Sequence, residues 1–268
     1  MTADLTSLVS DARRLRDRHR APEPLILPNA WDVASARGVE RAGAAAVATT
    51  SSGVAEALGY PDGEAIPAAE MFAAVARISA AVSVPVTADL EAGYGLAADE
   101  LVDRLLEAGA VGLNLEDTDH AGDPHHLLEV GAAAERIHAV RSAADDAGVP
   151  IVVNARIDSF LRGSGGPDAQ LDDALRRGRA YLAAGADCIY PIWLTDAKAI
   201  ERLVREVQAP INVLLRPGVP DIARLAALGV RRISVGGGLA RHALAHTEEL
   251  ARQVLAGDGS AFLELGED

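Results

Sequence analysis

The chain has 268 residues, 49% of them hydrophobic, so it can bury a sizeable core and is neither disordered nor collagen-like. Aromatic residues make up only 3%, which leaves the core to Ala, Val, Leu and Ile, as in α/β proteins. The formal charge of −14 argues against nucleic acid and anionic membranes as partners, but not against small acidic substrates. One cysteine, Cys188, excludes intrachain disulfides and Cys-rich metal sites. Because there is neither a membrane-spanning apolar run nor a signal-peptide core, we expect a cytoplasmic protein.

Short apolar segments alternate with segments of helical spacing along the chain. Residues 1–20 predict a leading helix outside the main fold. Strands are then predicted, entered alternately after proline and after a glycine that ends the preceding helix. These strands lie near 25–29, 45–50, 85–90, 111–116, 150–156, 187–192, 210–215 and 232–235. The helices that follow them are expected over 32–41, 67–81, 98–108, 131–146, 170–184, 196–206, 219–227 and 239–255.

This order of elements predicts the fold class. Nearly continuous apolar strands are typical of a parallel sheet that is buried on both faces. Eight β/α units in a chain of this length predict one (β/α)8 TIM-barrel domain over 1–268, with a terminal helix and tail over 239–268. A doubly wound open sheet is the alternative, but that fold usually begins with a Gly-rich turn, and LPNAWDVAS has no glycine.

Carboxylates gather at the predicted strand ends, where a TIM barrel has its site. Asp89 and Glu91 are two residues apart and therefore face the same way, and either Glu116 or Asp117 points inward from the next strand. Converging carboxylates without a nearby lysine repel one another unless a cation lies among them, and oxygen ligands suit Mg²⁺ or Mn²⁺. The alternative is that these residues are helix caps and solvated loop residues.

Other polar residues at the strand ends are candidates for binding a substrate. Arg156 could hold a carboxylate or phosphate, or form a structural ion pair with one of the acids. Asn212 lies in an apolar run, so it is either a satisfied core amide or a substrate contact. The small-residue turn at Thr50, Ser51 and Ser52 could bind an anion through successive backbone N–H groups.

The predicted loop after the fourth strand carries His120, His125 and His126. Histidine is a common general acid or base near neutral pH. Three histidines in one loop are also compatible with ordinary exposed polar residues.

Several motifs together resemble the isocitrate lyase/phosphoenolpyruvate mutase superfamily, from Leu27 to about Leu244. They are LPNAWDVASA, TTSSGVAEALGYPDG, VTADLEAGYG, GLNLEDT, VVNARIDSF, RAYLAAGAD and INVLLRPG, in this order and at barrel spacing. The resemblance implies a Mg²⁺-dependent enzyme that makes or breaks the bond next to a pyruvate-like enolate. It also implies a homotetramer or homodimer formed through the terminal helices.

Site roles follow from the resemblance motif by motif. It implies that Asp89 binds Mg²⁺ directly and that three outer carboxylates hold metal-bound waters: Asp62, Glu91 and Glu116. It further implies substrate contacts from the Thr50–Ser52 turn and Asp89, from Arg156 toward the pyruvoyl part, and from Asn212 on the far side.

The chain also departs from the family pattern. Glu91 stands where the family usually has aspartate, the catalytic Cys loop is replaced by DTDHAGDPHHLLEV, and Ile192 replaces a glutamate found in many lyases. We therefore expect a divergent carbon–carbon lyase acting on a small 2-hydroxy or 2-keto (di)carboxylate. The alternatives are an oxaloacetate-type hydrolase or decarboxylase, a phosphonopyruvate mutase or hydrolase, and a non-enzymatic binding protein.

An enolate must finally receive a proton, so the missing cysteine needs a replacement. Among the loop histidines we rank His120 first, because it follows Glu116 by four residues. The rivals are Tyr94 and a metal-bound water held by Glu91 or Glu116. The expected catalytic set is thus Arg156, Glu116, His120 and Tyr94.

Overall fold

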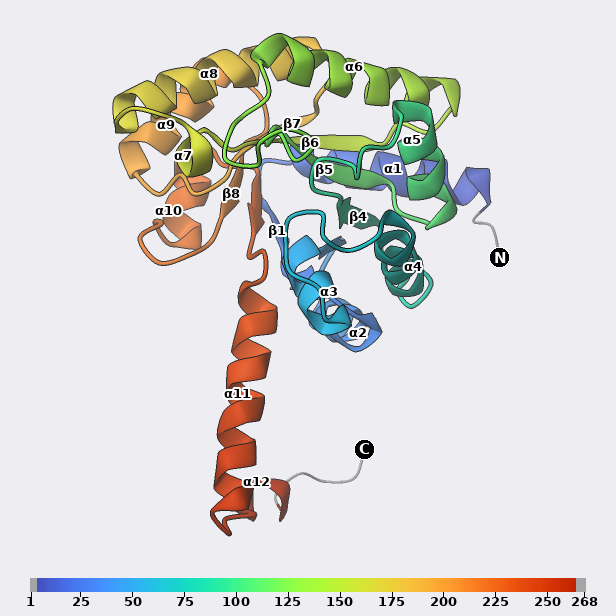
Figure 1. Ribbon diagram of the computed structural model, residues 1–268, viewed down its shortest axis with the longest axis vertical. Coiled ribbons are helices and arrows are strands. Elements are labelled where there is room, and N and C mark those ends of the chain that lie inside the picture. The colour runs from blue at the N-terminus through green and yellow to red at the C-terminus, as the bar shows by residue number, and fades with distance from the viewer. Residues whose placement is uncertain (1–3, 264–268) are drawn as a thin grey trace.

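The computed structural model describes residues 4–263, and its parallel strands are surrounded by helices (Figure 1). The strands are β1 (Leu25–Leu27), β2 (Asn29–Ala30), β3 (Val47–Thr49), β4 (Val86–Asp89), β5 (Gly112–Glu116), β6 (Val152–Ile157), β7 (Cys188–Pro191), β8 (Asn212–Leu214) and β9 (Arg232–Ser234). The helices are α1 (Leu5–Arg20), α2 (Val33–Arg41), α3 (Ser51–Leu58), α4 (Ala68–Ser79), α5 (Ala98–Glu107), α6 (Val130–Asp146), α7 (Ser159–Arg162), α8 (Pro167–Ala183), α9 (Ala197–Val207), α10 (Ile222–Ala227), α11 (Gly238–Leu255) and α12 (Ser260–Leu263).

The strand pairings follow the order of a (β/α)8 barrel. One parallel sheet runs β2-β3-β4-β5-β6-β7 and a second runs β1-β9-β8. The sheets are linked by a parallel bridge between Ile189 and Ile211, and through the chain at Pro28, which lies between β1 and β2. The predicted first strand is therefore divided in two: its first half pairs with β9 and its second half with β3.

Glycines end helices where the sequence pattern predicts them. Gly43, Gly109, Gly185 and Gly229 have φ angles of 95°, 76°, 106° and 91°, a left-handed region that favours glycine. Each lies just after a helix and shortly before a buried strand segment. The repeat seen in the sequence therefore corresponds to the repeated β/α unit of the barrel.

Helix α1 was expected outside the barrel, but one of its faces packs on the barrel. Its side chains Leu8, Ala12, Leu15 and His19 are buried. Arg16 donates a hydrogen bond to the Ile151 carbonyl, 3.1 Å away and just before β6. The strand starts thus lie under α1, which leaves the opposite ends of the strands open for a site.

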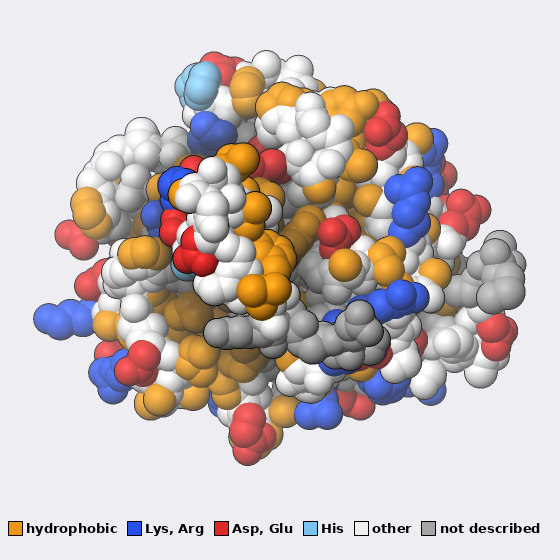
Figure 2. All heavy atoms as spheres, turned by 90° about the horizontal axis from the view of Figure 1, so that it is seen from below, with side chains coloured by type: hydrophobic (Ala, Val, Ile, Leu, Met, Phe, Trp, Pro, Cys, Tyr) orange, Lys and Arg blue, Asp and Glu red, His pale blue; other side chains and the backbone are white. Residues whose placement is uncertain are grey.

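Helix α11 projects away from the barrel as a long rod, with α12 near its far end (Figure 1). Only Ala240 is buried along it. Figure 2 shows the face from which this helix projects, where hydrophobic side chains gather. None of the helices in the described part of the chain has the length and hydrophobicity needed to cross a bilayer.

Candidate active site

A cavity of about 560 Å³ opens at the carboxyl ends of the strands. Its walls include six of the residues predicted from sequence: Thr50, Ser51, Ser52, Asp62, Asp89 and Arg156. The walls also include side chains that the sequence analysis did not select, from the ends of β7 and β8 and from α11: Tyr190, Trp193, Arg216 and Arg241.

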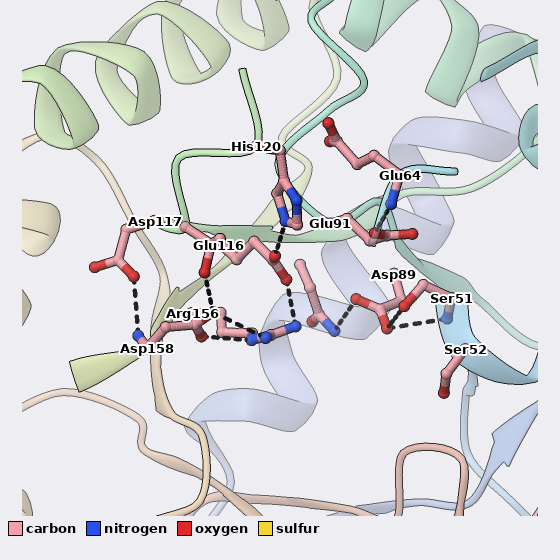
Figure 3. A network of polar contacts seen from close by, with 12 residues as sticks. Ser51, Ser52, Glu64, Asp89, Glu91, Glu116, Asp117, His120, Arg156 and Asp158 are labelled. Atoms are coloured by element: carbon pink, nitrogen blue, oxygen red, sulfur yellow. Dashed lines mark hydrogen bonds and ion pairs between the residues drawn. The ribbon is translucent and has the colours of Figure 1, made fainter. Parts of the chain in front are cut away.

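Asp89 ends β4 and is fixed from both sides. One carboxylate oxygen accepts hydrogen bonds from the backbone N–H and the hydroxyl of Ser51, each at 3.0 Å. The other oxygen accepts the side-chain amide of Asn114 at 3.0 Å. These donors hold Asp89 at the mouth of the barrel (Figure 3).

The predicted turn at residues 50–52 is the start of helix α3, which the sequence analysis did not predict. Thr50 is the N-cap and Ser51 is the first helical residue. The first N–H groups of a helix lack acceptors within the helix, so those of Ser52 and Gly53 remain available to an anion. The Ser51 N–H is already bound to Asp89, so the predicted anion site has one backbone donor fewer than the sequence indicated.

Arg156 forms the ion pair that the sequence left as an alternative. Its guanidinium donates to both carboxylate oxygens of Asp158, at 2.7 and 2.9 Å, and also pairs with Glu116. These two carboxylates raise the pKa of Arg156 well above its ordinary value, although burial opposes them. Arg156 nevertheless lines the cavity, so its guanidinium has an orientation set by the two acids and is accessible to a ligand.

The structure settles which acid at the end of β5 faces the site. Glu116 points toward Arg156 and His120 (Figure 3). Asp117 instead accepts hydrogen bonds from Arg177 and Tyr181 of α8. Burial raises the pKa of Asp117 to about 6. Asp117 therefore stabilises the contact between β5 and α8, and Glu116 belongs to the candidate site.

Glu91 is buried beside the cavity rather than on its wall. Its carboxylate accepts the backbone N–H of Glu64 and the Tyr94 hydroxyl, the latter at 3.0 Å. Glu64 in turn accepts the backbone N–H of Tyr94. Glu91 and Tyr94 have φ angles of 50° and 58°, an uncommon conformation for residues other than glycine. The Tyr94 hydroxyl thus donates its hydrogen bond to Glu91, and burial raises the pKa of this hydroxyl.

Electrostatics at the acidic cluster fit a bound cation. Burial, with the charges of Glu116, Asp89 and Asp62, raises the pKa of Glu91 to about 8. Burial and Asp89 also raise the pKa of Asp62. Carboxylates that raise one another's pKa are stabilised when a positive ion lies among them.

The donors are all oxygen atoms, which suits Mg²⁺ or Mn²⁺. Within residues 4–263, no group of three or more His, Cys, Asp or Glu side chains converges closely enough to hold a metal by itself. Two acids of this cluster, Asp62 and Asp89, line the cavity and could contact an ion there.

His120 is directed at the site, unlike the other two loop histidines. Its Nε2 lies 2.5 Å from a carboxylate oxygen of Glu116. This hydrogen bond raises the pKa of His120, while partial burial lowers it. His125 and His126 are exposed, and His126 contacts Asp123.

Two asparagines belong to the polar groups inside the barrel. Asn212 is fully buried, accepts a hydrogen bond from Ser234 at 3.2 Å, and does not line the cavity. Its Nδ2 atom is buried without a hydrogen-bond partner, so a substrate contact by Asn212 stays a prediction. Asn114 was not selected, yet it joins Asp89 to Asn154 and Arg232. Its position two residues before Glu116, facing the barrel interior, is the signal that could have found it.

Comparison with known proteins supports one family. The family model for phosphoenolpyruvate phosphomutase matches residues 15–255. A crystal structure from Burkholderia cenocepacia, provisionally described as a phosphonomutase, is 41% identical, with a TM-score of 0.85, covering 91% of this chain and 100% of that one.

Named proteins show how the family varies. An uncharacterized protein of Mycobacterium tuberculosis is 33% identical, covering 82% of this chain and 80% of its own. Oxaloacetate decarboxylase 2 of Pseudomonas fluorescens is 29% identical (76% and 70% covered). The 2-methylisocitrate lyase of Bacillus subtilis is 28% identical (75% and 65% covered). The chain thus belongs to the phosphoenolpyruvate phosphomutase family, within a superfamily of lyases and mutases that act on small carboxylic acids.

Proposed function

We propose that the protein is a Mg²⁺- or Mn²⁺-dependent lyase that cleaves a carbon–carbon bond in a small 2-hydroxy or 2-keto dicarboxylate. The observation that carries this proposal is the cluster of Asp62, Asp89, Glu91 and Glu116 beside Arg156 at the mouth of the barrel. Such a cluster serves a reaction in which negative charge develops on a ligand held next to a cation.

The acids of the cluster have separate expected roles. Asp89 lines the cavity and is held by Ser51 and Asn114, so it would bind the metal directly. Asp62, Glu91 and Glu116 would hold metal-bound water. When bound, the ion supplies Lewis-acid stabilisation of an enolate oxygen.

The chain's own residues bind and orient the substrate. Arg156 is held by Asp158 and Glu116, so its direction is set before a ligand arrives. A preorganised guanidinium binds a carboxylate with little further ordering. The free N–H groups at the start of α3 supply further donors to the same anion. No contact with the substrate is assigned to Asn212.

For a hydroxy acid, the hydroxyl would lose its proton to a carboxylate of the acidic cluster and become the carbonyl of one product. The electron pair of the broken carbon–carbon bond stays on the carbon next to the carbonyl of the other product, and this enolate must accept a proton there. His120 is the proposed donor, because Glu116 directs its ring toward the acidic cluster. Tyr94 is the weaker candidate, since its hydroxyl is bound to Glu91.

Decarboxylation of an oxaloacetate-like acid is the second candidate. It is favoured by the similarity to an oxaloacetate decarboxylase and by the loop after β5, which has neither the cysteine nor the lysine of the usual lyase loop. This reaction needs the same enolate and the same final protonation. It differs only in releasing carbon dioxide.

A turnover screen tests the proposal. The purified protein is incubated with 2-keto and 2-hydroxy acids, with Mg²⁺ or with EDTA, and the products are followed by NMR. Metal-dependent release of a 2-keto acid together with a second carbonyl or carboxylate product supports the lyase, whereas release of a 2-keto acid with carbon dioxide as its only co-product supports the decarboxylase. Titration with oxalate, a mimic of the pyruvate enolate, separates an enzyme from a binding protein without this chemistry. Absence of Mg²⁺-dependent oxalate binding contradicts the proposal.

A further inference from the structure

A buried arginine without a counter-ion crosses the interior of the barrel. Arg232 is the first residue of β9 and is only 1% exposed. Among the described residues, no carboxylate lies within 4.0 Å of its guanidinium, and its Nε has no hydrogen-bond partner. Burial lowers the pKa of Arg232, because a charge held away from water is unfavourable. A charge buried in this way destabilises a fold unless other groups compensate it, so its presence calls for a role.

One contact of Arg232 is with helix α1. The Nδ1 atom of His19 lies 2.8 Å from the Leu15 carbonyl, which only accepts, so Nδ1 carries the ring proton. Burial lowers the pKa of His19 to about 3, so the ring is neutral and its Nε2 is an acceptor. Arg232 therefore donates to this Nε2, at 3.3 Å. A neutral imidazole holds the guanidinium in place without neutralising its charge.

The second contact of Arg232 reaches Asn114 on the opposite side of the barrel. Strands β9 and β5 are four positions apart in the pairing order of the barrel. The Oδ1 atom of Asn114 accepts from Arg232 at 3.2 Å and from the side-chain amide of Asn154 at 2.7 Å. Asn154 can present either its amide nitrogen or its oxygen, whereas arginine has donors only. Arg232 is thus the partner that admits only the oxygen of Asn114.

The orientation of the Asn114 amide matters at Asp89. With its oxygen turned to Arg232, Asn114 donates from Nδ2 to Oδ1 of Asp89, at 3.0 Å. The Oδ2 atom of Asp89 accepts two hydrogen bonds from Ser51. A carboxylate oxygen has about two acceptor positions, so one position on Oδ1 remains unused. The chain of contacts from Arg232 through Asn114 therefore fixes the Asp89 carboxylate and leaves that position available.

We infer that Arg232 is a positioning residue for the expected metal ligand Asp89, acting from the far wall of the barrel through the amide of Asn114. The inference rests on the proposed function, since that proposal assigns the metal to Asp89. Outer partners that orient a metal ligand typically contribute roughly 10- to 100-fold to metal affinity. Arg232 thus lowers the stability of the fold and at the same time orders the candidate site.

Two simpler roles of Arg232 predict different results. A guanidinium that acts only through its electric field repels a nearby cation, so its removal strengthens metal binding. An arginine that serves only the packing of the barrel stabilises the fold, so its removal lowers stability. A positioning role predicts weaker metal binding with no loss of stability, because replacing a buried charge with an apolar side chain is often neutral or stabilising.

Mn²⁺ binding and urea unfolding of the metal-free protein test the inference. Dissociation constants are measured from the electron paramagnetic resonance of free Mn²⁺, without substrate, in Arg232→Met, Asn114→Ala and the double variant. We expect Arg232→Met to weaken Mn²⁺ binding about 10-fold or more in the wild-type background. In the Asn114→Ala background, where the connection to Asp89 is already broken, the same change should cost less than about 3-fold. The urea midpoint of Arg232→Met should equal or exceed that of the wild type.

Two further variants separate the donor from the charge. Arg232→Lys keeps the positive charge and can still donate to Asn114, so it should retain part of the Mn²⁺ affinity. Arg224→Met is the control matched in charge, because Arg224 is exposed on α10. It should bind Mn²⁺ as the wild type does.

Unchanged or tighter Mn²⁺ binding in Arg232→Met overturns the inference. An equal loss in both backgrounds also overturns it, and so does a lower urea midpoint that accompanies weaker binding. Because no substrate is used, these results are separate from the proposed reaction. If Mn²⁺ binding couples Arg232 to Asn114 while no 2-keto or 2-hydroxy acid is turned over, the lyase proposal fails and the positioning role stands. If turnover is found but Mn²⁺ binding is independent of Arg232, the positioning role alone fails.

Discussion

Asp89 is the residue on which the metal proposal depends most. It is the only acid of the cluster that both lines the cavity and is fixed by donors from two neighbouring elements, Ser51 of α3 and Asn114 of β5. Removing it takes away the expected direct ligand while the other acids remain.

We predict that Asp89→Ala abolishes Mg²⁺-dependent binding of oxalate. The remaining carboxylates would have to hold the ion through water alone, and no close group of three exists among the described residues. Isothermal titration calorimetry with and without Mg²⁺ measures the effect. Asp103→Ala, at an exposed position of α5, is the control and should bind as the wild type does. Unchanged oxalate affinity in Asp89→Ala contradicts the assignment.

His120 carries the prediction for the proton transfer. Once a substrate is found, His120→Gln should lower kcat by roughly 10²–10⁴ with little change in oxalate binding. The hydrogen bond that the His120 ring donates to Glu116 raises the pKa of His120, so its protonated, proton-donating form is lost as pH rises through a value above 6.5. Wild-type activity should therefore fall on the alkaline side, and the variant should lack this step.

The matched control for His120 is His126→Gln, because His126 lies in the same loop but is exposed and paired with Asp123. It should keep near-wild-type kcat. Near-wild-type kcat in a triple variant at His120, His125 and His126 would remove histidine from the mechanism and leave Tyr94 or water.

Sequence patterns located most of these residues but not their partners. The period of two in a strand placed Asp89 and Glu91 together, yet it could not decide between Glu116 and Asp117. That choice depends on Arg177 and Tyr181, which lie 60 and 64 positions after Asp117 on α8. Asn212 shows the same limit, because the sequence could not show that Ser234, on the neighbouring strand, bonds only its Oδ1 and leaves its buried Nδ2 without a partner.

At the scale of elements, the eight β/α units could be predicted because glycine and proline mark their boundaries. Helix α3 was missed because TTSSG has the composition of a turn, and its helical start is stabilised by the distant Asp89. Helix α1 was placed outside the barrel because its contacts with the strand starts are long-range. Its buried His19 shows the contact most clearly, since this ring lies 2.8 Å from the Leu15 carbonyl and 3.3 Å from Arg232 of β9.

We predict that α1 makes the protein sensitive to acid. Burial, and then the charge of Arg232, lowers the pKa of His19 to about 3. The unfolded chain binds this proton near pH 6.5, so the free energy of unfolding falls as pH drops below about 6.5, by about 1.4 kcal/mol per unit, until pH 3. Urea unfolding of the wild type and of His19→Gln at pH 7.5 and pH 5 measures this free energy. Between the two pH values, the free energy of unfolding of the wild type should fall by about 2 kcal/mol more than that of the variant. Equal losses contradict the prediction.

At the scale of the whole molecule, the projecting helix α11 is the feature that a single chain does not explain. Residues 239, 243, 244, 250, 251, 254 and 255 are apolar and share one side at helical spacing. Leu244 is 49% exposed and Leu255 is 88% exposed. Beside β1 and α2, a groove of about 330 Å³ is lined by apolar residues that include Leu25, Ile26 and Val39. An apolar helix side and an open apolar groove on one molecule can each be covered by a second copy.

We predict that the protein forms a homodimer or homotetramer through α11. Leu244→Glu should reduce the mass measured by light scattering at micromolar concentration, because it places a charge on the apolar side that a partner would bury. Gln253→Glu adds the same charge on the polar side of α11, where Gln253 donates to Glu249, and should keep the wild-type mass. Arg241 begins this same helix and lines the candidate cavity, so assembly also fixes one wall of the site. A monomeric wild type, or equal masses for the wild type and Leu244→Glu, would show that the apolar side of α11 is not an interface between copies of this chain.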